Sequence, residues 1–294
     1  MNIFITGAKS FIGNELIKQI KSKTKHKVYG CDIVDDERRF IFKADIRNKN
    51  FYLKIPKKIN TIIHLAAISR DQECKKDLSE CYKTNVIGTL NVINAAKKLK
   101  VKKLIFASTE WVYHDELAKV GCNEKSKLNL EKLNSDYAKT KLISEYNLED
   151  FYVNQKIDVT ILRFGIIYGD RFFHWSAVES LFNLVKNNKI INVGSLKTSR
   201  KFIHVNDVCL GIIKSLKLKN FSIINLQGKK LITLREIINL SKKILKKEIK
   251  VIEKDSKRPS IRNIKSVKSF KKISLTPKID LENGLNRLKK FLNF

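Results

Sequence analysis

The 294-residue sequence has little proline and no long apolar run, and both absences exclude classes of protein. With three prolines and no low-complexity tract, no flexible linker is expected to divide the chain. No apolar stretch approaches the ~20 residues that a membrane-spanning helix needs. The first apolar stretch, Ile3–Ile5, runs directly into Thr6 and Gly7 without the cleavage site of a secretory signal. We therefore expect a soluble cytoplasmic protein without membrane contact.

Cysteine is also scarce, and its pattern argues against a disulfide framework or a zinc site. The five residues are odd in number and contain no C-x-x-C pair. This favours reduced thiols, and no bound metal is expected. The cysteines are Cys31, Cys74, Cys81, Cys122 and Cys209.

Acidic residues are outnumbered, with 29 Asp and Glu against 60 Lys and Arg, which gives a net charge of +31. Of the basic residues 49 are Lys, a solvated point charge, whereas base readout and bidentate phosphate contacts favour Arg. The lysines spread from Lys9 to Lys290 instead of forming one arm. No specific nucleic-acid partner is predicted, although non-specific polyanion binding at low salt is expected.

The first half of the chain alternates short apolar runs with amphipathic segments, which predicts βαβ units and a doubly wound parallel sheet of the Rossmann type. The predicted strands are rich in Ile, Val and Phe and span Asn2–Ile5, Lys27–Cys31, Thr61–Leu65, Lys102–Ala107 and Val159–Phe164. The predicted helices span Phe11–Lys23, Thr84–Leu99 and Ser135–Gln155.

The pattern changes near residue 165, where we place the boundary between a cofactor-binding domain (1–165) and a smaller α/β substrate-binding lobe (166–294) interleaved with it. The predicted helices of this part are Ser176–Lys189, Asp207–Lys217, Thr233–Lys247 and Asp280–Leu292, with short strands at Lys201–Val205 and Ser222–Leu226. In doubly wound folds ligands bind at the carboxyl ends of the strands. The active site is therefore expected between the sheet and this lobe.

Two segments carry the chemistry expected of a dinucleotide enzyme. Small residues between Gly7 and Gly13, after a strand and at a helix start, would let backbone amides approach a pyrophosphate. Asp32 ends the second strand, where a carboxylate can hold the ribose hydroxyls or simply be solvated. Tyr137 and Lys141, one helical turn apart, share a face, and an ammonium beside a phenol would lower the phenol pKa toward working pH. An ordinary amphipathic helix remains the alternative for this pair.

Taken in order along nearly the whole chain, these and further motifs resemble the nucleotide-sugar epimerase and dehydratase branch of the extended short-chain dehydrogenase/reductase family. Thr6–Gly13 is similar to T-G-x-x-G-x-x-G, with Ser10 in place of the middle glycine. The other matching segments are Asp45-Ile46-Arg47 (D-[IL]-R), His64–Ala67 (H-L-A-A), Asn85–Thr89 (N-V-x-G-T), Tyr137–Lys141 (Y-x-x-x-K), Leu162–Gly169 (L-R-x-x-N-x-Y-G), Arg200–Val208 (R-D-F-I-H-V-x-D-V) and Arg258-Pro259 (R-P).

The resemblance implies NAD as cofactor and a nucleotide sugar as substrate. It assigns catalysis to Thr109, Tyr137 and Lys141, and substrate binding to Thr109, Arg200 and Arg258. The implied cofactor-binding residues are Gly7, Ser10, Phe11, Ile12, Gly13, Asp32, Asp45, Ile46, Leu65, Ala66, Ala67, Tyr137 and Lys141. Family members are often dimers, which leaves a homodimer open.

Departures from the family pattern bear on the reaction. Ile166 stands where many relatives have a substrate-contacting Asn. Dehydratases of this family carry Asp-Glu directly after the catalytic Thr, whereas this chain has Glu110 and Trp111, and an indole cannot accept a proton from the sugar. The leading hypothesis is an NAD-dependent epimerase acting through a keto sugar. A keto-sugar reductase, a dehydratase, and a non-catalytic dinucleotide sensor or RNA-binding protein on the same fold are the alternatives.

Overall fold

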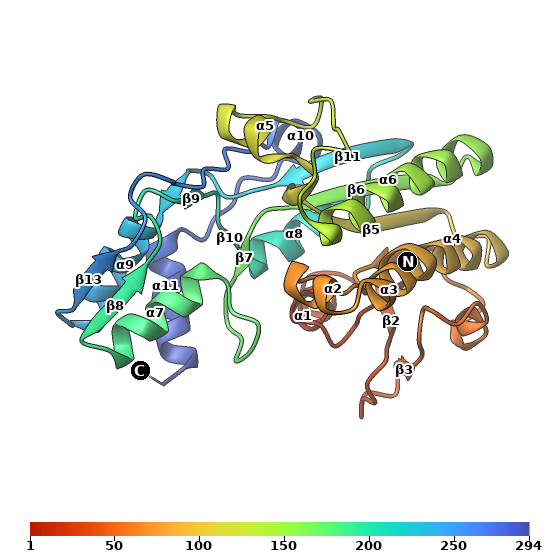
Figure 1. Ribbon diagram of the computed structural model, residues 1–294. Helices are drawn as coiled ribbons and strands as arrows, with labels where there is room; N and C mark the ends of the chain where they lie inside the picture. The colour runs from red at the N-terminus through yellow and green to blue at the C-terminus, as the bar shows by residue number, and fades with distance from the viewer. Residues whose placement is uncertain (294) are drawn as a thin grey trace.

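A seven-stranded parallel sheet organises the larger part of the computed structural model, which describes residues 1–293 (Figure 1). Its strand order is β11-β6-β5-β4-β1-β2-β3. In chain order the strands are β1 (Asn2–Thr6), β2 (Lys27–Asp32), β3 (Ile41–Lys43), β4 (Thr61–His64), β5 (Lys103–Thr109), β6 (Asp158–Phe164) and β11 (Phe221–Leu226). Every residue of β4 and β5 is buried, as their continuous apolar runs require in a sheet covered on both faces.

Helices cover both faces of this sheet, which confirms the predicted doubly wound architecture. On one face α1 (Phe11–Lys23) and α8 (Val205–Ser215) pack through a core that includes Leu16 and Ile212. On the other, α4 (Gly88–Lys98) and α6 (Asp136–Gln155) pack through a second core. The carboxyl ends of the strands face the remaining part of the chain (Figure 1).

A smaller lobe lies beyond that edge, with a core of its own that includes Phe182, Ile237 and Leu285. Its helices are α7 (Ala177–Asn187), α9 (Leu234–Leu245) and α11 (Leu281–Phe291). Three two-stranded pairs accompany them, namely β7 (Ile167–Tyr168) with β10 (Ile203–His204), β9 (Ser199–Arg200) with β12 (Ile232–Thr233), and β8 (Ile190–Val193) with β13 (Lys250–Glu253). The division of the chain at residue 165 stays a prediction.

Two predicted strands differ from the structure. The expected strand Lys201–Val205 is too long, because only Ile203–His204 (β10) forms a strand there and His204 caps helix α8 from Val205 onward. The strand expected at Ser222–Leu226 exists, but it pairs with β6 as the edge of the large sheet and does not lie in the lobe.

The remaining short elements connect these layers. They are α2 (Asp71–Lys76), α3 (Leu78–Tyr82), a π-helical turn at Lys83–Ile87, α5 (Asp115–Val120), α10 (Val267–Ile273) and 3₁₀ turns at Phe51–Lys54 and Glu110–Val112.

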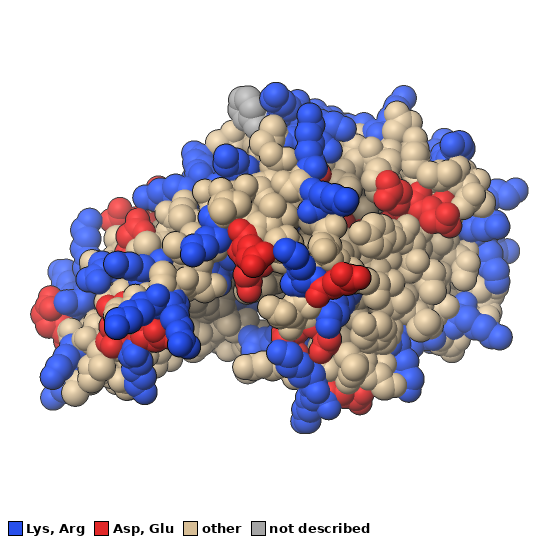
Figure 2. Space-filling view, turned by 45° about the horizontal axis from the view of Figure 1, so that its top comes forward, with Lys and Arg blue, Asp and Glu red and all other residues tan. Residues whose placement is uncertain are grey.

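Across residues 1–293, no helix is long and apolar enough to cross a membrane. Figure 2 shows Lys and Arg side chains scattered over both parts of the visible face instead of gathered into one patch. The charge excess of the sequence is thus dispersed on this side of the molecule.

Candidate active site

The turn after β1 brings three backbone segments unusually close together. Gly7 has a φ of +70°, and a Cβ there would lie 2.8 Å from the Ala66 nitrogen. A Cβ on Gly13 would lie 2.3 Å from the Gly7 carbonyl oxygen. Ser10 replaces a glycine of the motif without disturbing this turn, because its hydroxyl caps α1 by accepting from the Gly13 amide at 3.0 Å. The result is a helix N-terminus suited to a phosphate, and we call residues 6–13 the phosphate turn.

Asp32, at the end of β2, faces this turn. The Lys9 amide donates to its Oδ2 at 2.9 Å, and the Val34 amide to its Oδ1 at 3.4 Å. Nearby, a side-chain hydrogen bond from Arg38 lowers the pKa of Asp36 to about 2. The carboxylate of Asp32 therefore stands beside the phosphate turn, as the motif predicts for a ribose-binding acid.

The loops after β3 and β4 complete the same edge. Asp45 receives a hydrogen bond from the Arg47 Nε at 2.9 Å, and the Ile46 carbonyl accepts from the Asn91 side chain at 2.8 Å. Leu65, Ala66 and Ala67 follow β4 and border the phosphate turn. The Leu65 amide donates to the Thr6 carbonyl at 3.1 Å, and the Ala66 amide to the Thr6 hydroxyl at 3.3 Å.

A chain of buried polar groups links these loops to helix α6. The Thr6 hydroxyl lies 2.7 Å from His64 Nδ1, and His64 Nε2 lies 3.0 Å from the Thr89 hydroxyl. Burial lowers the pKa of His64 to about 3, so the ring is neutral. Asn85, one turn before Thr89, donates to the Thr140 hydroxyl at 3.0 Å. Cofactor-side strands and the helix that carries Tyr137 are thus fixed to one another.

The smaller lobe reaches this edge through the loop after β7. Phe11 and Ile12, half-buried in the first turn of α1, lie beside it. The Arg171 guanidinium sits 4.5 Å from the centre of the Phe11 ring. His174 Nδ1 approaches the Glu73 carboxylate of α2 at 3.7 Å. The lobe and the sheet therefore meet over the candidate cofactor site.

The structure brings Thr109, Tyr137 and Lys141 together at the end of β5 and the start of α6. The Thr109 hydroxyl lies close enough to the Tyr137 phenol to lower its pKa. Lys141 is buried and donates to the Ala107 carbonyl at 2.8 Å. The Tyr137 amide is held by Asp71 at 3.3 Å. Side chains from two separate segments of the sequence therefore lie together.

The pKa expected for the phenol requires a correction. Burial raises the pKa of Tyr137 to about 12, and the Thr109 hydroxyl offsets this only in part. Burial also lowers the pKa of Lys141 to about 7, against the opposing charge of Glu145. The expected lowering of the phenol pKa by Lys141 is wrong for this structure, because desolvation outweighs the opposing contribution of Thr109.

A buried ion pair anchors α6 to the sheet. Arg163 of β6 donates to both carboxylate oxygens of Glu145, at 3.0 Å from Nε and 2.6 Å from Nη2. The Ser108 hydroxyl also bonds to this carboxylate, and Arg163 donates to the Tyr113 hydroxyl at 2.9 Å. Because Glu145 lies one turn after Lys141, this pair sets the position of the catalytic helix.

Sequence reasoning missed Arg262, which is 1% exposed beneath the candidate sugar site. Its Nη2 donates to the Glu110 and Tyr113 carbonyls at 2.7 and 2.6 Å, and its guanidinium lies 4.4 Å from the Trp111 ring. Its Nε faces the buried Glu110 carboxylate at 3.4 Å. Glu110 is therefore already partnered inside the protein. The one available signal was the position of Arg262 just after the R-P motif.

The two arginines predicted to bind substrate differ in their surroundings. Arg200 donates to the Ser260 carbonyl at 2.6 Å and to its hydroxyl at 2.8 Å, and lies 5.7 Å from the Trp111 ring. Arg258 is exposed, and its guanidinium makes no hydrogen bond or ion pair with the rest of residues 1–293. Arg200 therefore borders the site with a fixed side chain, whereas Arg258 does not share these contacts.

The expectation of five reduced cysteines is wrong for two of them. Cys74 and Cys81 form a disulfide with Cα atoms 5.0 Å apart, because α2 and α3 fold back on each other around Asp77. The other three cysteines are free and buried. Within the described residues, no group of three or more His, Cys, Asp and Glu side chains is arranged to hold a metal ion.

Comparison with known proteins agrees with this geometry. Residues 3–226 match the model of a family described as "NAD dependent epimerase/dehydratase family". The chain is 25% identical to a putative UDP-glucose 4-epimerase of Methanocaldococcus jannaschii, covering 97% of this chain and 96% of that one. It is 28% identical to a dTDP-D-glucose 4,6-dehydratase of Dictyostelium discoideum over 70% of this chain, and spans only 53% of that relative.

Among solved structures, UDP-glucose 4-epimerase of Thermotoga maritima, determined with UDP-glucose, has a TM-score of 0.90. The alignment covers 100% of this chain and 99% of that one at 22% identity. At this identity the likeness establishes the fold.

Proposed function

Because this chain belongs to the NAD dependent epimerase/dehydratase family, we propose that it epimerises a nucleotide-linked sugar through transient oxidation to a keto sugar. The observation that carries the proposal is the cluster of Thr109, Tyr137 and Lys141 beside the phosphate turn. A protein that only senses a dinucleotide has no need to place a tyrosine hydroxyl beside Thr109 at this point. The family assignment likewise favours an enzyme over an RNA-binding protein.

The cradle around Gly7 and Gly13 fits NAD, since side chains there would collide with neighbouring backbone. The amides that open α1 would hold the pyrophosphate, and Asp32 the adenosine ribose. Asp45 and Ile46 would border the adenine, and Leu65–Ala67 the central part of the cofactor. When bound, NAD supplies the acceptor and then the donor of one hydride.

The chain's own residues would handle the proton. Tyr137 would take up the proton of the sugar hydroxyl and return it after the keto sugar has turned over in the site. Because burial raises its pKa to about 12, it would do so as a phenolate stabilised by the positive charge of bound NAD. Thr109 donates a hydrogen bond to the reacting oxygen. Lys141 donates to the Ala107 carbonyl and would hold the nicotinamide ribose when NAD is bound. Burial of this cluster excludes water that would compete for the proton.

The positions after Thr109 argue against the dehydratase alternative. Glu110 is buried against Arg262 and cannot be presented to a sugar without breaking that contact. Trp111 offers only an indole N–H, which donates and does not accept. Without a base at this position, the oxidised sugar is expected to be reduced again and not to eliminate water.

Incubation with NAD and a panel of nucleotide sugars tests this proposal. Mass spectrometry and proton NMR are expected to show a product of unchanged mass with inverted stereochemistry at one carbon. A product lighter by one water would mean dehydration and overturn the argument from Trp111. Consumption of reduced cofactor in step with product would mean a reductase, and no turnover on any nucleotide sugar would favour a sensor.

Asp32 should determine the choice between NAD and NADP. Its carboxylate accepts a ribose hydroxyl but repels a 2′-phosphate, so we expect tighter binding of NAD. In Asp32→Ala, with Lys9 and Arg38 close by, the preference should shift toward NADP. Calorimetric titration of both cofactors checks this, and equal or better binding of NADP by the unmodified protein would contradict it.

Arg200 should contribute to substrate affinity by holding the diphosphate. A charge-assisted hydrogen bond contributes roughly 1.5–3 kcal/mol, so Arg200→Ala should raise the substrate Kd about tenfold or more with little change in NAD binding. Arg258→Ala should have the smaller effect, because this side chain is not fixed in the structure. An unchanged substrate Kd in both variants, or loss of folding in Arg200→Ala, would indicate a structural role.

A further inference from the structure

A cavity of about 310 Å³ lies near the carboxyl end of β11. Its walls are the segments that follow β9 and β11 and the residues on both sides of α10. Three lysines line it, namely Lys201, Lys229 and Lys265. None of the described residues around it is Asp or Glu, and no ion pair joins these three ammonium groups to residues 1–293. The lining is thus positively charged, and an opposing charge, the Glu110 carboxylate, acts on Lys201 from behind Gln227.

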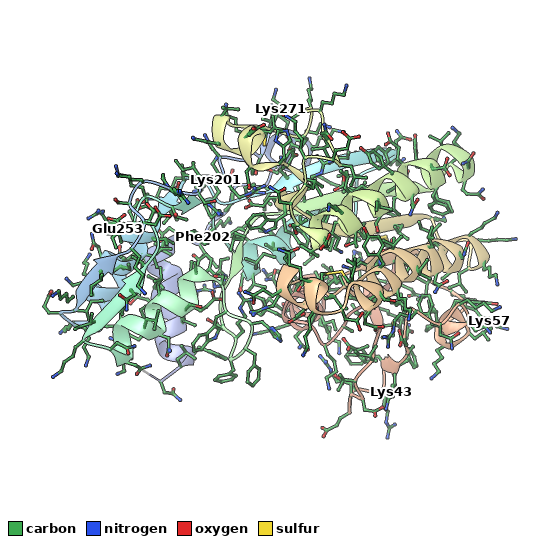
Figure 3. The ribbon with its side chains drawn as sticks, viewed as in Figure 1. Lys43, Lys57, Lys201, Phe202, Glu253 and Lys271 are labelled. Atoms are coloured by element: carbon green, nitrogen blue, oxygen red, sulfur yellow. A yellow bond between two sulfur atoms is a disulfide. The ribbon has the colours of Figure 1, made fainter. Side chains whose placement is uncertain are left out.

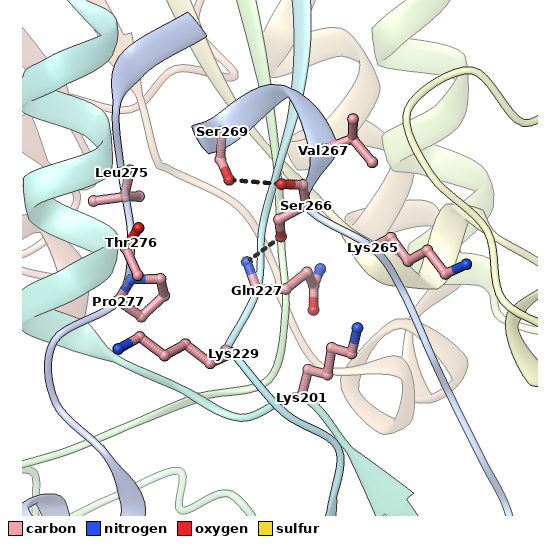
Figure 4. A pocket seen from close by; sticks show the side chains of 11 residues that line it. Lys201, Gln227, Lys229, Lys265, Ser266, Val267, Ser269, Leu275, Thr276 and Pro277 are labelled. Carbon is pink, nitrogen blue, oxygen red and sulfur yellow. Dashed lines mark hydrogen bonds between the residues drawn. The ribbon is translucent and has the colours of Figure 1, made fainter. Parts of the chain in front are cut away.

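Lys201 is the least exposed of the three. It is half-buried, and Figure 4 shows its ammonium pointing toward the Gln227 side chain. Burial lowers its pKa, and the ammonium of Lys265 lowers it further. The family motif has an acidic residue at this position, so the sign of the charge is reversed here. Two positive groups beside one cavity raise each other's energy unless an anion lies between them.

Hydroxyl groups add further donors to the same wall. The Ser266 hydroxyl oxygen accepts from the backbone N–H of Gln227 at 3.1 Å (Figure 4). The hydroxyl proton of Ser266 is therefore available to a ligand. Thr276 lies on the opposite side of the opening, and Figure 4 shows Lys229 extending to that side and Lys265 to the other. Ammonium and hydroxyl donors around a small cavity are the groups that bind phosphate oxygens.

The cavity is separate from the candidate sugar site. Arg200 and Lys201 are neighbours on an extended segment, so their side chains point to opposite sides. Arg200 contacts Ser260 and Trp111 on the catalytic side. Lys201 and Gln227 face the cavity, and Gln227 stands between it and the Glu110 carboxylate, to which its amide donates at 2.8 Å when oriented to satisfy both neighbours.

We propose that this cavity is a second ligand site, which binds a small phosphorylated molecule through Lys201, Lys229 and Lys265 independently of the sugar substrate. Lysine suits such a site because its ammonium is a mobile point charge that can follow a phosphate. A cavity of this size is at the lower end of the range for small-molecule sites, which fits a compact phosphate ester.

Calorimetric titration of the NAD-saturated protein with inorganic pyrophosphate tests the proposal, at about 0.15 M salt to screen diffuse attraction. In Arg200→Gln, which removes the proposed diphosphate contact of the sugar site, we expect one remaining site per chain. Lys201→Gln should weaken it about tenfold, the factor that corresponds to the loss of ~1.4 kcal/mol, and Lys201→Gln/Lys265→Gln should weaken it further. Should Lys201→Gln fail to fold, the exposed Lys229→Gln provides the same test.

Two variants separate this site from its rivals. Lys57→Gln removes one charge far from the cavity, as Figure 3 shows, and should leave binding unchanged. Arg200→Gln, which alters the catalytic side only, should also leave it unchanged. Equal losses in Lys57→Gln and Lys201→Gln would show non-specific attraction to a basic protein. Loss of pyrophosphate binding in Arg200→Gln but not in Lys201→Gln would place the ligand in the sugar site and overturn the proposal. Absence of any saturable pyrophosphate binding would also overturn it.

Discussion

Tyr137→Phe is expected to lower kcat by about 10²–10⁴-fold, the range typical for loss of a positioned acid–base group. The substitution removes the phenolic oxygen beside Thr109 but keeps the ring at the start of α6. NAD affinity should change little, since Lys141 and the phosphate turn are untouched. Turnover of the preferred nucleotide sugar and calorimetric binding of NAD measure the two effects separately.

A matched control is available on the same helix. Tyr146 is 50% exposed on α6, and Tyr146→Phe removes a phenolic oxygen without touching the cluster. It should keep the activity of the unmodified protein. Retention of activity in Tyr137→Phe, or an equal loss in both variants, would assign proton transfer to another group.

Arg163→Met is expected to cost about 3–5 kcal/mol of unfolding free energy, because it leaves the Glu145 carboxylate buried without its partner. Both side chains of the pair are 4% exposed. Denaturant unfolding followed by circular dichroism measures the loss. The double variant Arg163→Met/Glu145→Gln should recover much of it, since a neutral amide can still accept from the Ser108 hydroxyl.

The exposed pair Lys132–Glu116, 3.3 Å apart, provides the comparison. Lys132→Met should change stability by less than about 1 kcal/mol, because solvent screens this pair. A small effect in Arg163→Met, or no recovery in the double variant, would mean that the carboxylate is relieved by water or by its own protonation. Position of the catalytic helix would then depend on apolar packing instead.

The close turn between β1 and α1 could be predicted from sequence because its residue types follow from local backbone demands. Gly7 needs a positive φ, Gly13 needs a missing Cβ, and Ser10 caps a helix, all within one turn. Tyr137 and Lys141 are likewise one helical turn apart. Local constraints of this kind fix the residue types at a given spacing, so the sequence alone predicts them.

Features that depend on distant segments could not be predicted in this way. Arg262 contacts Glu110 and Trp111 only because the fold brings together segments about 150 residues apart in the sequence. The Cys74–Cys81 disulfide depends on how α2 and α3 turn around Asp77, which no apolar periodicity encodes. The pKa of Tyr137 depends on how deeply α6 packs, and spacing alone does not specify depth.

A nascent chain cannot complete the large sheet until β11 has left the ribosome. Phe221 pairs with Val159 and Leu226 with Phe164, so β6 presents an open edge while the intervening residues of the lobe are being synthesised. Unpaired strand edges recruit other chains, and slow elongation prolongs that exposure. Translation pauses between residues 165 and 226 should therefore favour aggregation of the nascent protein, and chaperone demand should fall once β11 closes the edge.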